Sequence, residues 1–105
     1  MWLFAKNGFL SVVECQTKPD RLLVRARVRG DLEAYFPNSK VIRTPHHDYL
    51  YRTVVPRESA AARIASAVMA IDYPEFKAAI SDKRRAAYYF SVWDNLYLMQ
   101  EQLNQ

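Results

Sequence analysis

The chain has 105 residues, half of them hydrophobic and a quarter charged, which is typical of a folded globular protein. A chain of this length can bury one core without disulfides or metal, so we expect a single domain spanning residues 1–105. No apolar run reaches the roughly 18 residues of a membrane helix, and the first residues lack the pattern of a signal peptide. The only cysteine, Cys15, excludes an internal disulfide, and we expect a cytoplasmic protein.

The net charge is +4, and the excess lies in the first part of the chain. Residues 1–57 hold ten Lys and Arg against five Asp and Glu, whereas residues 58–105 hold five against six. This balance permits an anionic partner, but it is well below the charge of a dedicated nucleic-acid coat.

Three strands are predicted in the first 29 residues. Trp2–Ala5 and Phe9–Cys15 are rich in aromatic and β-branched residues, and Asn7-Gly8 between them favours the positive φ angles of a tight hairpin turn. After a further turn, Arg21–Arg29 alternates between apolar and cationic residues, as a half-buried strand does.

The segment that follows predicts a short helix, a loop and a fourth strand. Asp31 is placed to cap a helix from Leu32 to Phe36, which Pro37 ends. The residues up to His47 are predicted to form a connecting loop with at most a short extended piece, and alternation then returns from Asp48 to Val55.

Helical spacing dominates the rest of the chain. An alanine-rich helix is predicted from Arg57 to Ile71, a capping-box pattern at Asp72 opens a short helix through Ile80, and Ser81-Asp82 caps a last helix from Lys83 to Gln100. The order ββ-β-α-β-α-α-α predicts an α+β fold: a four-stranded antiparallel sheet with helices packed on one face.

Four segments carry a resemblance: MWLFAKNGFLSVV, LLVRARVRGDLE, DYLYRTVV and IDYPEFK. Together they resemble a family of small bacterial proteins of unknown function, with the pattern MWxFxxxGFxSVV followed by DYPxFK. The resemblance covers most of the chain and implies one compact domain. It implies no activity, cofactor or catalytic residue. Members of that family continue the first helix for several more turns, whereas Pro37 ends it here.

The run LLVRARVR is the most informative functional feature. Arg25, Arg27 and Arg29 alternate with apolar residues, which predicts a cationic stripe on one strand face. One interpretation is a solvated face that discourages edge pairing. The other is a binding surface, joined by Arg52 and Lys6, for an acidic protein or for nucleic acid. Tyr49 and Tyr51 could supply stacking for a base, but alternation along the predicted strand places both on the face opposite Arg52.

Two further groups of polar residues are candidate sites. The last helix begins with three cations, Lys83, Arg84 and Arg85, whose charge opposes the helix dipole. One interpretation is that they bind a partner, and the other is that they form a solvated helix end. His46 and His47 are adjacent and have no third ligand at a fixed spacing, so we expect a loop pair and no metal site.

The last helix carries more aromatic surface than one packed flank needs. Its apolar residues spread over roughly 200° of the circumference at 100° per residue. Tyr89, Trp93 and Tyr97 are therefore candidates for a homodimer contact, and the alternative is a core position within the same chain.

No phosphate loop, nucleophile elbow or paired carboxylates can be assembled from the sequence, so we expect a non-enzymatic binding module without cofactors. The partner is expected to be anionic, an acidic protein before nucleic acid, and no membrane is involved. The alternative is an inhibitor or regulator from a phage or other mobile element that docks on host nucleic-acid machinery.

Overall fold

The structure is a computed structural model that describes all residues, 1–105. The chain divides into two compact units, Met1–Asp72 and Tyr73–Gln105, and each is described by itself. The single-domain expectation stays a prediction. No helix of the structure combines the length and the apolar character needed to cross a membrane.

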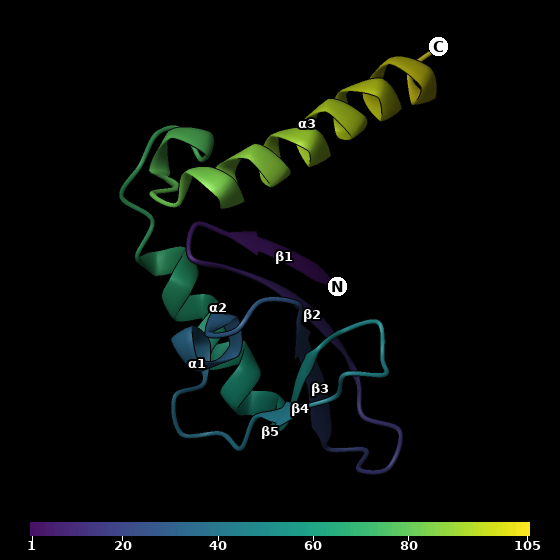
Figure 1. The fold of residues 1–105 in the computed structure, drawn as a ribbon, viewed down its shortest axis with the longest axis vertical. Helices are drawn as coiled ribbons and strands as arrows, with labels where there is room; N and C mark the ends of the chain where they lie inside the picture. The colour runs from purple at the N-terminus through teal and green to yellow at the C-terminus, as the bar shows by residue number, and fades with distance from the viewer. The chain divides into compact units, whose positions relative to one another are not determined.

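The first unit contains a five-stranded antiparallel sheet in the order β1-β2-β3-β5-β4 (Figure 1). Its strands are β1 (Trp2–Ala5), β2 (Gly8–Glu14), β3 (Arg21–Ala26), β4 (Ile42–Arg43) and β5 (Tyr51–Pro56). The α+β class with an antiparallel sheet is confirmed, and one strand is added. The addition, β4, arises inside the expected loop, because Ile42 and Arg43 pair with the start of β5.

The β1–β2 hairpin is confirmed, but its turn differs from the expected one. Gly8 already belongs to β2 and pairs with Ala5, and neither Asn7 nor Gly8 has a positive φ. A Cβ atom on Gly8 would lie 3.3 Å from the Tyr35 ring and 3.4 Å from the Asp31 carboxyl carbon. Glycine therefore leaves room for the side chains of helix α1 (Asp31–Tyr35), and a larger residue would require the Tyr35 ring to shift by a few tenths of an ångström.

Helix α1 begins one residue earlier than predicted and is not capped as predicted. Gly30 holds the N-cap position with a φ of 94°, a left-handed conformation that favours glycine. Because the N-cap residue is a glycine, no side chain at this position caps the helix. The Asp31 carboxylate accepts a hydrogen bond of 3.0 Å from the backbone N–H of Phe9 and so links the helix to β2.

The core of this unit lies between one sheet face and two helices, α1 and α2 (Arg57–Met69) (Figure 1). Val24 and Leu32 are 0% and 1% exposed, and Ala60 brings α2 into the same cluster at 0%. The remaining members of the cluster are Leu10, Val12, Ala26, Phe36 and Val55. Because side chains alternate along a strand, the residues between these core positions lie on the other face of the sheet.

The second unit consists of a single 3₁₀ turn, η1 (Lys77–Ala79), and the long helix α3 (Lys83–Leu103). The predicted cap of α3 is confirmed, because the Asp82 carboxylate accepts hydrogen bonds from the backbone N–H groups of Arg84 and Arg85 at 2.9 and 3.2 Å. The predicted helix through Ile80 is wrong, since only η1 forms there.

The capping box expected at Asp72 does not form. The Asp72 carboxylate lies 3.8 Å from the Lys6 ammonium group of the β1–β2 turn, both in the first unit. Pro74 disfavours a helical conformation at the residue before it, which is consistent with the late start of η1.

Candidate functional site

Arg25 and Arg27 share the ring of one buried tyrosine. Their guanidinium carbons lie 4.5 and 4.2 Å from the centroid of the Tyr49 ring, which is 3% exposed. Arg25 alternates with the core residues Val24 and Ala26, so its side chain lies on the sheet face opposite the two helices. Cation–π attraction therefore holds both arginines on this face.

Tyr49 reaches this face because the fourth predicted strand begins later than expected. β5 starts at Tyr51, so the alternation that would place Tyr49 opposite Arg52 does not extend to it. The Thr44 hydroxyl instead donates a hydrogen bond of 2.8 Å to the Tyr49 carbonyl, and the Thr44 N–H donates one of 2.7 Å to the Leu50 carbonyl. These bonds fold the loop back over the arginines.

The guanidinium groups of Arg25 and Arg27 are held by neutral partners. Arg25 donates through Nη2 to the Ser11 hydroxyl at 2.9 Å, and its buried Nε has no hydrogen-bond acceptor. Arg27 donates through Nη1 to the backbone carbonyl of Asp48 at 2.7 Å. Neither arginine forms an ion pair with a carboxylate, so no acidic side chain of the chain neutralises either positive charge.

Arg52 is the register neighbour of Arg25 but is electrostatically paired. Its Nη2 lies 3.3 Å from Oδ1 of Asp48, and its Nε donates to the Thr44 hydroxyl at 3.3 Å. We call Arg25, Arg27, Arg52 and Tyr49 the arginine–tyrosine cluster. Arg52 anchors the loop to the sheet. The positive charges of the cluster that have no ion-pair partner are those of Arg25 and Arg27.

Arg29 lies outside this cluster, and the predicted strand Arg21–Arg29 ends three residues earlier than expected. β3 ends at Ala26, and the Arg29 Nε donates a hydrogen bond of 3.4 Å to the hydroxyl of Tyr51, which packs against the core. That bond lowers the pKa of Tyr51 below its usual value, and Arg43 adds to the effect. The same bond raises the pKa of Arg29.

Exposed apolar side chains flank the cluster on the same face. The register aligns one row across the strands: Trp2, Ser11, Arg25, Arg52 and Ile42. Directly opposed residues point to the same face, and the two ends of the row, Trp2 and Ile42, are 65% and 53% exposed. Sequence reasoning missed both residues, because only the strand pairing brings them into line with the arginines.

The cations that open α3 are partly compensated within the second unit. The Asp82 carboxylate caps the helix, and the backbone N–H groups of Arg85 and Arg84 that bond to it lower its pKa below the usual value. Arg85 also donates through Nη1 to the Tyr89 hydroxyl at 3.2 Å. Lys83 and Arg84 are exposed.

The three residues expected at a dimer contact separate into two groups. Tyr89 is 8% exposed and stacks on Phe76 at 5.8 Å between centroids, so it belongs to the interior of its own chain. Trp93 and Tyr97 are 46% and 48% exposed and stack on each other at 5.6 Å. Lys77 lies over the Trp93 ring at 4.4 Å.

The remaining candidates form no reactive cluster. His46 and His47 are exposed, and no three His, Cys, Asp or Glu side chains are grouped as metal ligands would be. Cys15 is 6% exposed and its sulfur lies 3.5 Å from the Thr17 hydroxyl, a hydrogen bond that lowers the pKa of the thiol.

Comparison of the chain with protein-family models, with curated proteins and with solved structures finds no match.

Proposed function

We propose that the first unit is a non-enzymatic binding module, and that its arginine–tyrosine cluster docks an acidic segment of a partner protein. The observation that carries this proposal is the pair Arg25 and Arg27, stacked on Tyr49 without a carboxylate partner. Guanidinium groups form charge-assisted, often bidentate hydrogen bonds with carboxylates.

The two guanidinium groups are ordered before a partner arrives. The Ser11 hydroxyl, the Asp48 carbonyl and the Tyr49 ring restrict the rotamers of Arg25 and Arg27. Binding then costs less side-chain entropy than it would for freely rotating arginines.

The surroundings favour a protein over nucleic acid. The Tyr49 ring is buried beneath two guanidinium groups, so it offers no face on which a base could stack between the arginines. The exposed Trp2 and Ile42 beside the arginines match the mixture of aromatic, aliphatic and Arg side chains that protein interfaces favour.

The test is a binding measurement with a fluorescent glutamate-rich peptide. We expect the double variant Arg25→Gln/Arg27→Gln to weaken binding by about tenfold or more. The matched control, Lys18→Gln/Arg57→Gln, removes the same charge at exposed positions outside the cluster and should bind nearly as the wild type does. Equal losses in the two double variants would show a non-specific charge effect and end the proposal.

A single-stranded oligonucleotide distinguishes the rival partner. Under the proposal the peptide outcompetes it at moderate salt. If the oligonucleotide binds more tightly, with an affinity that falls steeply with salt and depends on Arg25 and Arg27, the partner is nucleic acid and the proposal is wrong.

We also propose that α3 pairs with α3 of a second copy. Val92, Leu96, Met99 and Leu103 recur at spacings of four, three and four residues, the spacing of a coiled-coil seam, and the last three are at least 50% exposed. The first turn of α3 holds cationic residues, whereas Asp94 and Glu101 lie in the second half of the helix. In an antiparallel pair, the first turn of each helix therefore faces the acidic half of the other.

A further inference from the structure

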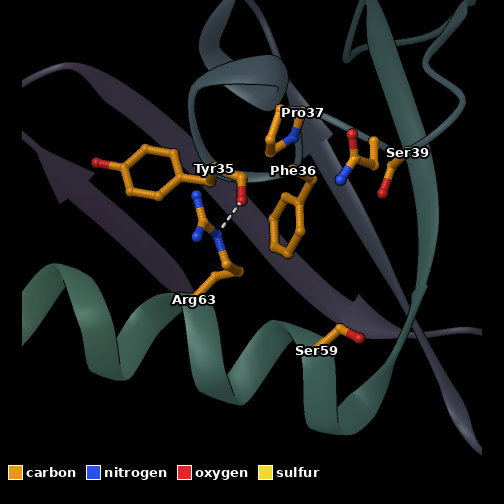
Figure 2. Close-up of a pocket in the computed structure, with 7 residues that line it drawn as sticks. Tyr35, Phe36, Pro37, Ser39, Ser59 and Arg63 are labelled. Atoms are coloured by element: carbon orange, nitrogen blue, oxygen red, sulfur yellow. Dashed lines mark hydrogen bonds between the residues drawn. The ribbon is translucent and has the colours of Figure 1, made fainter.

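A pocket of about 230 Å³ opens where the end of α1 approaches α2 in the first unit (Figure 2). It is lined by Tyr35, Phe36, Pro37, Asn38, Ser39, Ser59 and Arg63. This volume leaves room for a small organic molecule.

Arg63 is the only charged residue of the lining, and most of its donors are unused. Its Nε donates a hydrogen bond of 2.6 Å to the Tyr35 carbonyl at the end of α1, which fixes the guanidinium group beside the pocket (Figure 2). The two terminal amino groups have no hydrogen-bond or ion-pair partner within the chain.

The other polar groups of the lining also lack side-chain partners. The hydroxyls of Ser39 and Ser59 and the side-chain amide of Asn38 make no hydrogen bond within the chain. No acidic side chain lines the pocket, so its donors face no competing carboxylate. A carboxylate can accept two parallel hydrogen bonds from the free terminal amino groups of the guanidinium fork.

The remaining lining favours a ligand with an apolar body. The apolar part of the lining consists of the exposed Pro37 and of Phe36, which is 5% exposed and belongs to the core cluster (Figure 2). We propose that this pocket binds a small carboxylic acid, with the carboxylate on Arg63 and a compact apolar group against Phe36. This inference does not rest on the proposed function, because the arginine–tyrosine cluster lies on the other face of the sheet.

The test is an NMR titration of the ¹⁵N-labelled full chain with benzoate and, in parallel, with its neutral analogue benzamide. We expect benzoate to cause saturable shifts at the amides of Ser39, Ser59 and Arg63, with a millimolar dissociation constant. Benzamide should shift the same amides several-fold less, because it lacks the charge that Arg63 recognises. Equal shifts with both compounds, or benzoate shifts centred on Arg25 and Arg27, would overturn the inference.

Two variants separate binding from folding. Arg63→Gln should abolish the benzoate shifts, whereas Arg57→Gln on the same helix should retain them. Because Arg63→Gln also removes the bond to the Tyr35 carbonyl, Ser59→Leu provides a second probe that fills the pocket and leaves that bond intact. Unchanged benzoate binding in Ser59→Leu would show that the ligand lies elsewhere. Binding of the glutamate-rich peptide should be the same in all three variants.

Discussion

Arg25 lies directly across from Arg52 in neighbouring antiparallel strands, although both side chains are cationic. Like charges in opposed positions destabilise a sheet, so the pair needs compensation. Asp48 supplies it to Arg52 through an ion pair, and Tyr49 supplies it to Arg25 through its ring. The loop that carries both residues is therefore the element on which the cationic face depends.

Replacing Tyr49 by Leu should destabilise the first unit. The substitution removes a buried ring and two cation–π contacts, and we expect a loss of about 2–4 kcal/mol in the free energy of unfolding, measured by urea titration. Tyr49→Phe is the matched control, because it keeps the ring and its hydroxyl has no partner within the chain. Equal losses in both variants would contradict the role given to the ring.

Leu32 should be among the residues on which the stability of the first unit depends most. Leu32→Ala removes a side chain that is 1% exposed and joins α1 to the sheet, so we expect a loss of about 2–5 kcal/mol. Val28→Ala, at a position 50% exposed, should change the free energy of unfolding by less than about 0.5 kcal/mol. Comparable losses at the two positions would place the core elsewhere.

The start of α3 should respond to acid through Asp82. Its pKa is lower in the folded chain than in the unfolded chain, so its stabilising effect is present above the unfolded pKa and is lost as the pH falls through the folded pKa. Asp82→Asn keeps a good cap that does not titrate, whereas Asp82→Ala removes the cap at every pH.

Far-ultraviolet circular dichroism measures this response. Between pH 6 and pH 2, the wild type should lose more helical signal than Asp82→Asn does, and Asp82→Ala should begin with less signal. An identical acid response in the wild type and Asp82→Asn would assign the effect to other carboxylates.

The ionisation of Tyr51 should report on Arg29. Removing the donor in Arg29→Gln should raise the pKa of Tyr51 towards its usual value, because the phenolate loses a hydrogen bond and a nearby positive charge. A ¹³C NMR titration resolves this tyrosine from the other six. Arg27 contacts Tyr49 and not Tyr51, so the control Arg27→Gln should leave the pKa of Tyr51 unchanged.

Self-association through α3 should be disrupted by a charge in the seam. Light scattering at high micromolar concentration should show a dimer for the wild type and a monomer for Leu96→Glu. Ser91→Glu adds the same charge at another exposed helix position and should preserve the dimer. A monomeric wild type would end this proposal.

Much of the fold could be predicted because local patterns determine it. The helix from Arg57 and the cap at Asp82 follow from residues close in sequence. β4 could not be predicted, since a two-residue strand exists only through its pairing with β5. The candidate site could be predicted only in part. Alternation along the sequence identifies Arg25 and Arg27. Tyr49 reaches them through a bend before β5, and Trp2 is aligned with Arg25 only by the strand register, so neither residue follows from local pattern.

The sheet ends at both edges in short strands: β4 has two residues and β1 has four. Such edges offer few unpaired backbone groups to an incoming extended chain, and natural proteins use this device to prevent intermolecular sheet growth. Under the proposed function, a partner of the first unit gains little from adding a strand at β1 or β4. Its recognition then comes from side chains, which makes it sensitive to single substitutions and selective for the sequence it meets.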